Sequence, residues 1–399
     1  MAPTRTTTAR RNGIGVHRTG PGTAAGQYLR SFWQPVFHSE DLPVERTKPV
    51  KIMSSDYALY RGKDGTPFLI DPICPHRGAR LSVGTIEGNE IRCFYHGWKF
   101  DGLGRCVDQP AEPQPFCDKV AIRSYPCRDY LGLIFAYLGE GAPPAFPRYP
   151  TFENFEGFLE CDSYIRDCNY FNNLENGGDL THSGFVHRKN PGSFDGLESS
   201  PVISAQESCW GITVMAEWPD RKQQSQIGMP NIFHHKAQPT DPSIAIFREF
   251  MAWWVPIDDE SHWQFTVAAV RLPPDKAEQY KERRKARLAK RVGPNREFAQ
   301  KILAGELYFD QIDPDTVDWV RLQDDVAQAF APPPAERLGQ GDRAVILIRK
   351  VWQRELRAFQ SGKRLTSWTY DLNELSISRG EELEAIYETQ VGRRETQPA

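Results

Sequence analysis

The chain has 399 residues, of which 39% are hydrophobic, 12% aromatic and 25% charged, so it can bury a sizeable core over two or three domains. Forty-nine Lys and Arg balance fifty-two Asp and Glu, and the formal charge of −3 excludes a general nucleic-acid binder. No apolar run approaches the roughly 20 residues of a membrane span, and the N-terminus lacks the apolar stretch of a signal peptide. We expect a cytoplasmic protein that binds neither nucleic acid nor membrane.

The first two regions along the chain are a short arm and a small β domain. Residues 1–30 are rich in Thr, Arg and Gly, which predicts a loose N-terminal arm. From 31 to 145, short β-rich runs alternate with turn signals such as Lys63-Asp64-Gly65, so we expect a domain of antiparallel strands. The linker Gly139-Glu-Gly-Ala-Pro-Pro-Ala-Phe-Pro ends it.

The third region, residues 146–399, mixes longer strand candidates with helices. Strands are predicted over 204–216, 244–255 and 263–272, and the last two flank a hairpin turn. Helices are predicted over 171–181, 275–291, 317–330 and 380–390. The fold class is therefore α+β: a small antiparallel domain, then a large antiparallel sheet with helices packed against it.

Two short motifs gather metal-ligating side chains in the small β domain. Cys74-Pro-His76 and Cys93-Phe-Tyr-His96 each pair a thiol with an imidazole, and sixteen residues separate them. Zinc accepts Cys2His2, but the Cys-x-His spacing differs from that of zinc fingers. A [2Fe-2S] cluster with two Cys on one iron and two His on the other fits better. The alternatives are a zinc knuckle and a set of unrelated core residues.

A second group of such side chains lies in and after the predicted helix 171–181. Glu175, Asp179 and His182 stand at i, i+4 and i+7, so they share one helical face, and His187 follows past Gly184. Two His and a carboxylate are the facial triad that holds Fe(II) in non-haem oxygenases and leaves positions open for O2 and substrate. Alone the motif is weak, and its position after the first motif strengthens it.

These motifs resemble those of the Rieske non-haem iron aromatic ring-hydroxylating oxygenases, and further stretches look like the phthalate-type branch. The resemblance implies an α (terminal oxygenase) subunit, with a Rieske [2Fe-2S] domain followed by a helix-grip (START-like) catalytic domain. It also implies a head-to-tail homotrimer, in which one subunit's cluster faces the next subunit's iron. The motifs that carry it read Cys74-Pro-His-Arg-Gly, Cys93-Phe-Tyr-His-Gly-Trp-Lys-Phe-Asp and Asn172-Asn-Leu-Glu-Asn-Gly-Gly-Asp-Leu-Thr-His-Ser-Gly-Phe-Val-His.

The resemblance also implies roles for individual residues. His182 and His187 would bind the mononuclear iron, as their family counterparts do. The counterpart of Asp179 is a hydrogen-bonded bridge between an iron-bound His and a cluster His of the neighbouring subunit. The alternative for Asp179 is an ordinary carboxylate on the helix surface or in an N-terminal turn. The cluster ligands implied in the same way are Cys74, His76, Cys93 and His96.

The iron carboxylate is expected far downstream, in Gln323-Asp324-Asp325-Val326-Ala327-Gln328. In the phthalate-type branch this segment typically reads Gln/Glu-Asp and then a short spacer to Gln, so the resemblance favours Asp324. Asp325 would then be a solvated helix carboxylate.

The function implied by the resemblance is a terminal oxygenase that uses O2 at Fe(II) to hydroxylate or O-demethylate an aromatic substrate, of the aryl carboxylate or methoxylated phenol type. A separate reductase or ferredoxin component would pass electrons from NAD(P)H to the cluster. The alternatives are a cis-dihydroxylating dioxygenase and a Rieske electron-transfer or binding protein without oxygenase activity. The six remaining cysteines are expected to be small buried thiols.

Overall fold

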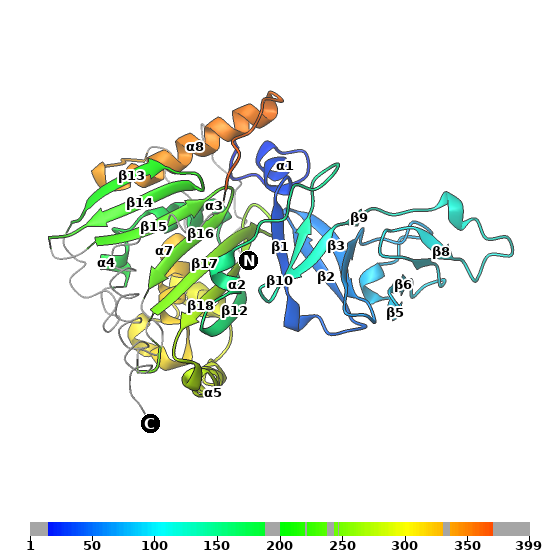
Figure 1. Ribbon diagram of the computed structural model, residues 1–399, viewed down its shortest axis with the longest axis horizontal. Coiled ribbons are helices and arrows are strands. Elements are labelled where there is room, and N and C mark those ends of the chain that lie inside the picture. The colour runs from blue at the N-terminus through cyan, green and yellow to red at the C-terminus, as the bar shows by residue number, and fades with distance from the viewer. Residues whose placement is uncertain are drawn as a thin grey trace, which may run out of the picture.

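The computed structural model describes residues 15–187, 200–219, 222–237, 243–245, 247–329 and 336–369, so the predicted helix 380–390 lies outside the described residues. Figure 1 shows three small sheets in blue and cyan at one end and one large, mostly green sheet at the other. All named strand pairs are antiparallel. The α+β class predicted from the sequence is confirmed.

The first half begins with helix α1 (Ala24–Arg30) and continues into two of the small sheets. The turn from β3 to β4 places Gly65 at φ +88°, as the Lys63-Asp64-Gly65 signal predicted. The three-stranded sheet has the order β1-β11-β10, formed by Trp33–His38, Leu133–Tyr137 and Cys127–Tyr130. The four-stranded sheet has the order β2-β3-β4-β9, formed by Thr47–Ile52, Ser55–Arg61, Pro67–Ile70 and Ser124–Tyr125.

The third small sheet forms the outer tip of this half in Figure 1. Its order is β5-β6-β7-β8, formed by Thr85–Glu87, Glu90–Arg92, Lys99–Phe100 and Cys106–Asp108. Because these strands are only two or three residues long, the loops between them make up most of the tip. A separate hydrophobic cluster packs beneath these loops and strands. The apolar residues of this cluster include Tyr60, Ile70, Leu81, Ile91 and Phe100.

The large sheet has seven strands in the order β12-β18-β17-β16-β15-β14-β13. The hairpin predicted between β17 and β18 is confirmed, and Asp258 Oδ1 accepts a hydrogen bond from Ser261 N at 2.9 Å in its turn. The single strand predicted over 204–216 is wrong, because the chain turns back at 208–210. The strands are Gly157–Arg166, Val202–Glu207, Gly211–Glu217, Lys222–Gly228, Ile232–Ala237, Phe247–Pro256 and His262–Arg271, numbered β12 to β18.

Gly211 explains why this hairpin forms after the turn at 208–210. Its φ is +148°, and a Cβ atom there would lie 2.3 Å from the carbonyl oxygen of Ile227 on β15. Only glycine fits such a close approach of two backbones. The tight start of β14 therefore depends on this residue.

Helices cover one face of the large sheet. The predicted helices 171–181, 275–291 and 317–330 are confirmed as α3 (Tyr170–Gly178), α5 (Ala277–Ala289) and α7 (Trp319–Gln328). The longest described helix, α8 (Arg343–Gln360), was not predicted, and it lies across β13 and β14 in Figure 1. Its buried stripe includes Val345, Ile348, Trp352 and Leu356. The remaining helices are α2 (Pro150–Glu153), α4 (Ser183–Val186) and α6 (Asn295–Leu303).

The two halves pack together through the opposite face of the large sheet. Trp253 contacts the rings of Phe135 and Tyr149, with centroid distances of 5.5 and 5.7 Å. A buried amide pair crosses the same junction, where Asn231 Nδ2 donates to Gln34 Oε1 at 2.9 Å. One hydrophobic cluster spans both halves, so they form one packed body. None of the described helices is both long and apolar enough to span a bilayer.

Candidate metal centres

The two Cys/His motifs lie in adjacent loops at the tip, one after β4 and one between β6 and β7. The loops use the same turn. The carbonyl of Cys74 accepts from Gly78 N at 3.0 Å, and that of Cys93 accepts from Gly97 N at 3.1 Å. Both glycines have positive φ, +77° and +75°, a conformation that side-chain-bearing residues rarely adopt. The repeated turn places two matching Cys/His pairs side by side.

The four side chains separate into a thiol pair and an imidazole pair. Cys74 and Cys93 are buried, and their thiols lie close enough for Cys93 to contribute to the raised pKa of Cys74. The rings of His76 and His96 lie 4.5 Å apart, centre to centre. Two thiols together and two imidazoles together are the donor arrangement of a [2Fe-2S] cluster with Cys on one iron and His on the other.

Two further observations fit a metal cluster in this place. Burial raises the pKa of Cys74 to about 11, so without a metal this thiol is protonated at neutral pH, and metal binding would release its proton. His76 Nδ1 is buried without a hydrogen-bond partner in the described structure. A buried lone pair that no donor uses suits a metal ligand.

Aromatic side chains surround the imidazole pair. Trp98 stacks on His76 with a centroid distance of 4.6 Å and an interplanar angle of 4°, which agrees with the shielding expected of a cluster site. Phe116 contacts Trp98 edge to face, with a centroid distance of 5.5 Å. Beyond these rings, Phe94 and Tyr95 are 79% and 54% exposed at the end of the loop. The tip therefore exposes aromatic side chains next to the imidazole pair.

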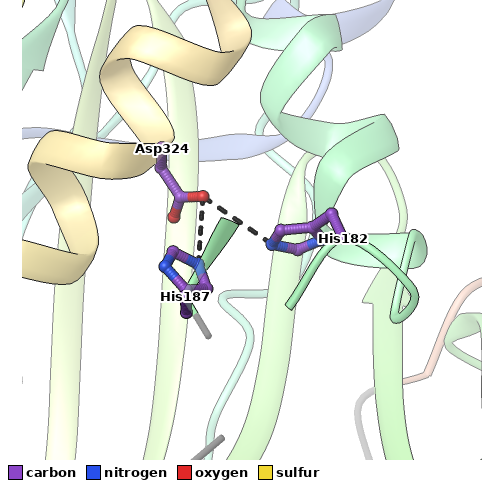
Figure 2. Close-up of side chains that lie close together, drawn as sticks. All are labelled: His182, His187 and Asp324. Atoms are coloured by element: carbon purple, nitrogen blue, oxygen red, sulfur yellow. Dashed lines mark ion pairs between the residues drawn. The ribbon is translucent and has the colours of Figure 1, made fainter. Parts of the chain in front are cut away.

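A second centre lies under the helices of the large sheet, where His182, His187 and Asp324 converge (Figure 2). Their ligand atoms lie within 4.8 Å of one another. Asp324 Oδ1 is 3.7 Å from His182 Nε2 and 3.3 Å from His187 Nε2. His182 comes from the turn between α3 and α4, His187 directly follows α4, and Asp324 lies on α7. Two neutral nitrogens and one carboxylate suit a divalent iron.

Hydrogen bonds to the far side of each imidazole fix its orientation. His182 Nδ1 faces the carbonyl oxygen of Asp179, and His187 Nδ1 lies 2.8 Å from Gln323 Oε1. Because both partners are acceptors, Nδ1 of each neutral ring carries the proton, and the Nε2 lone pair points at Asp324. The structure thus prepares both Nε2 atoms to bind a metal.

The contact between Asp324 and His187 shifts the pKa values of both side chains. Burial by itself raises the pKa of Asp324, but the hydrogen bond with His187 and the charges of His182 and Arg166 outweigh it and hold the pKa below its usual value. Burial lowers the pKa of His187, and the contact with Asp324 overcomes that effect and raises it. The carboxylate is therefore ionised at neutral pH, as a metal ligand must be.

The other residues of the 175–182 face lie in different places. Asp179 ends α3, and its Oδ1 accepts from the backbone N–H groups of Thr181 at 3.1 Å and His182 at 3.3 Å. Glu175 points away from the centre and forms an ion pair with Arg349 of α8 at 2.6 Å. The shared face predicted from spacing therefore does not bring Glu175 to the group formed by His182, His187 and Asp324.

The expectation for Asp325 is corrected by the structure. Its side chain is only 5% exposed and forms an ion pair with the buried Arg166 at 2.6 Å, so it is no solvated helix carboxylate. Asp324 is the member of the Asp-Asp pair that faces the two imidazoles.

Two polar neighbours of this centre were not predicted as site residues. Gln323 entered the prediction only as the first residue of the Gln-Asp pair, and its contact with His187 spans 136 positions. Asn176 Nδ2 lies 3.4 Å from His182 Nε2 and 3.5 Å from Asp324 Oδ1. Asn176 stands six residues before His182 on the predicted helix, and that placement was the available signal.

Comparison with known proteins supports the family that the sequence motifs indicated. Residues 32–126 match the family model described as Rieske [2Fe-2S] domain, so this part of the chain is a domain of the kind that holds a [2Fe-2S] cluster. The chain is 28% identical over 360 residues to the 5,5'-dehydrodivanillate O-demethylase oxygenase subunit of Sphingobium sp. (strain NBRC 103272 / SYK-6), covering 87% of this chain and 80% of that protein.

Two more similarities cover most of the chain. The phthalate 4,5-dioxygenase oxygenase subunit of Pseudomonas putida is 27% identical over 378 residues, 85% of this chain and 84% of that protein. The structure of dicamba monooxygenase bound to dicamba has the same fold, with a TM-score of 0.60, 21% identity, and coverage of 84% of this chain and all of that one. The chain belongs to the Rieske ring-hydroxylating oxygenases, as the α subunit that carries out the oxygenase reaction.

Proposed function

We propose that this chain is the terminal component that hydroxylates or O-demethylates an aryl carboxylate or methoxylated phenol at a mononuclear Fe(II) bound by His182, His187 and Asp324. The observation that carries the proposal is the convergence of two imidazole Nε2 atoms and one carboxylate within 4.8 Å. A Rieske protein that only carried electrons would have no need for this second donor set. O2 would be the co-substrate, and NAD(P)H would supply electrons through a reductase.

Iron bound there would supply one-electron redox chemistry and open coordination positions for O2. The chain's own residues prepare the site for it. Asp179 and Gln323 hold each imidazole by its Nδ1 proton, so neither ring needs to reorient when the metal enters. Asp324 contributes the single negative charge that balances part of the metal's charge.

The cluster would be held by Cys74, His76, Cys93 and His96. In Figure 1 the tip sheet β5-β8 and the helices α4 and α7 lie at opposite ends of the molecule. This separation supports transfer from the cluster of one subunit to the iron of another, in a homotrimer with Asp179 as the bridge. The carboxylate oxygen Oδ1 of Asp179 is engaged within its own turn, and its carbonyl holds His182, so the residue already lies beside an iron ligand.

Aromatic side chains on the helix-covered face of the sheet support an aromatic substrate. Phe233 contacts the rings of His235, Phe250 and Trp254, with centroid distances of 5.9, 5.7 and 5.4 Å. They lie against α3, since a Cβ added at Gly177 would be 2.7 Å from Trp254 Cη2. These aromatic rings, which pack against α3, suit a planar substrate. Curated relatives named for an O-demethylase and for a phthalate dioxygenase point to the same class of compound.

The test combines isotope-labelled O2 with two ligand variants. The iron-loaded protein receives NADH, a ferredoxin and reductase system, and a panel of aryl carboxylates and methoxyphenols, and products are identified by mass. Gain of one labelled oxygen or loss of a methyl group is expected, whereas a dihydrodiol would establish the dioxygenase alternative. Reduction of the cluster without product or O2 uptake would favour the electron-transfer protein.

The variants separate the two metal centres. His182→Ala and Asp324→Asn are expected to lose mononuclear iron while keeping the visible spectrum of the cluster. The matched control is His38→Ala, whose imidazole lies in the first half of the molecule and pairs with Asp41 at 3.4 Å. Unchanged iron content in His182→Ala would refute the ligand assignment.

A further inference from the structure

Two cysteines outside both metal centres face each other beside the cluster loops. Cys106 begins β8, and Cys117 begins a short helix, η3 (Cys117–Lys119). Their thiols lie close enough for Cys117 to contribute to the raised pKa of Cys106. The backbones hold them together, because Cys106 N donates to Val120 O at 3.1 Å and Val120 N donates to Cys117 O at 3.0 Å. The sequence predicted small buried thiols at both positions, and no local pattern indicates that the two lie next to each other.

The ten residues between these cysteines form a loop that packs against the imidazole side of the cluster motifs. A Cβ added at Gly97, which follows His96, would lie 2.9 Å from Cγ of Pro110 in this loop. At the loop's other end, Phe116 contacts Trp98, and Trp98 stacks on His76. The two cysteines therefore close the base of a loop that touches the surroundings of both cluster histidines.

The two thiols differ in their access to solvent. Cys106 is 6% exposed, whereas Cys117 is partly exposed and follows Phe116, which is 37% exposed. Burial raises the pKa of Cys106 to about 11, so it remains a thiol at neutral pH. An oxidant from solvent thus reaches Cys117 first, and Cys106 is positioned to react with the oxidised sulfur.

We propose that Cys106 and Cys117 are a reversible oxidation site, at which hydrogen peroxide forms an intramolecular disulfide that staples the 107–116 loop over the cluster. In the first step the Cys117 sulfur is oxidised by H2O2 to the sulfenic acid, and one water leaves. In the second step the Cys106 sulfur attacks Cys117, the S–S bond forms, the S–OH bond breaks, and a second water leaves with the thiol proton. A dithiol reductant reverses the change.

The disulfide has an expected effect on the cluster itself. With two thiolates and two neutral imidazoles, a [2Fe-2S] cluster is neutral when oxidised and anionic when reduced. A clamped loop limits the access of water, and a drier site disfavours the anion. Disulfide formation is therefore expected to lower the midpoint potential of the cluster. This effect does not depend on the mononuclear iron.

The test treats the cluster-loaded full-length protein with hydrogen peroxide, blocks free thiols, and maps peptides without reduction. A peptide pair joined through Cys106 and Cys117, about 2 Da lighter than the sum of the separate peptides, is expected, and dithiothreitol should restore both thiols. The midpoint potential, measured before and after, should fall and then recover.

Three single variants make the outcome specific. In Cys106→Ser, Cys117 should accumulate as a sulfenic acid that dimedone traps, and the potential should not respond to peroxide. In Cys117→Ser, Cys106 should stay unmodified, because it is buried. Cys209→Ser, which removes an exposed cysteine far from the tip, should behave like the unmodified chain. Peroxide treatment of the unmodified chain that leaves Cys117 as a lasting sulfenic acid with no bond to Cys106, or a disulfide between other cysteines, would overturn the proposal.

Discussion

Arg166 Nε donates a hydrogen bond to Asp325 Oδ1 at 2.6 Å, between two side chains that are only 3% and 5% exposed. The pair joins β12 to α7, and Arg166 also donates to Asn173 Oδ1 of α3 at 2.8 Å. Consecutive side chains on a helix point about 100° apart, so anchoring Asp325 fixes how α7 is rotated. That rotation directs the preceding residue, Asp324, toward the two imidazoles.

Arg166→Met is expected to lower the free energy of unfolding of the iron-free protein by about 3–5 kcal/mol, because it leaves a buried carboxylate without its partner. Chemical denaturation measures the loss. The matched control is Lys51→Met, which removes one partner of an ion pair with Asp258 whose side chains are 46% and 32% exposed. That surface pair should contribute below about 1 kcal/mol. Equal losses in the two variants would show that burial of the Arg166 pair does not matter.

Gln323→Leu is expected to weaken Fe(II) binding about 10- to 100-fold, because it removes the acceptor that orients His187. The variant keeps the side-chain volume, so the packing of α7 should change little. Equilibrium dialysis of the iron-free protein measures the affinity without relying on turnover. Gln323→Glu, which retains an acceptor for Nδ1, should bind iron more tightly than the Leu variant. If both variants bound iron like the unmodified chain, orientation of His187 would not depend on this contact.

Local spacing was enough to predict the tip of the molecule. Cys74, His76, Cys93 and His96 lie within two short loops, so their motif is readable in one stretch of sequence, and the fold class followed from the alternation of strand and helix signals. The two loops are close in the sequence, and the second is the hairpin between β6 and β7, so local signals locate both. The role of these residues as cluster ligands stays a prediction.

Contacts between residues far apart in the chain could not be predicted from the sequence. Asp325 pairs with Arg166 across 159 positions, and no local pattern distinguishes such a carboxylate from an exposed one. Helix α8 is a different case, because Ile348, Val351 and Trp352 repeat with helical spacing and its buried face was readable. Its last turn also carries Arg357 at a position that favours a helix end. This helix was therefore predictable from the sequence, because its apolar period and its end signal are both local.

His262 should make the protein less stable as the pH falls. Burial lowers its pKa to about 3, and the charge of Arg166 adds to the effect. Its Nδ1 lies 2.8 Å from the carbonyl of Cys168, and its Nε2 faces Asn173 Nδ2 at 3.1 Å, so a second proton would meet a donor. Between pH 6.5 and 3 the unfolded chain binds this proton and the folded chain does not, so stability declines as the pH falls through this range.

The loss from His262 should reach about 2 kcal/mol between pH 6.5 and pH 5, at about 1.4 kcal/mol for each pH unit. His262→Gln removes the titrating group, so its free energy of unfolding should vary less with pH over this interval. Denaturation curves at pH 7, 6 and 5 make the comparison. Two curves that stay parallel at all three values would contradict a depressed pKa for His262.

Asp179→Asn should keep the mononuclear iron and the local turn but slow the transfer of electrons from the cluster to the iron. An amide oxygen can still accept from the backbone N–H groups of Thr181 and His182, and the carbonyl that holds His182 Nδ1 is unchanged. The negative charge and the second acceptor oxygen are lost, and a bridge to an imidazole of another subunit needs them. Single-turnover reduction and product formation separate the steps, because the cluster should reduce at the normal rate while product formation falls.

Thr181→Val is the matched control, since it removes the hydroxyl that donates to Asp179 Oδ1 and leaves the charge in place. If that variant slowed product formation as much as Asp179→Asn, the turn would carry the effect, and the bridging role of the carboxylate would be refuted.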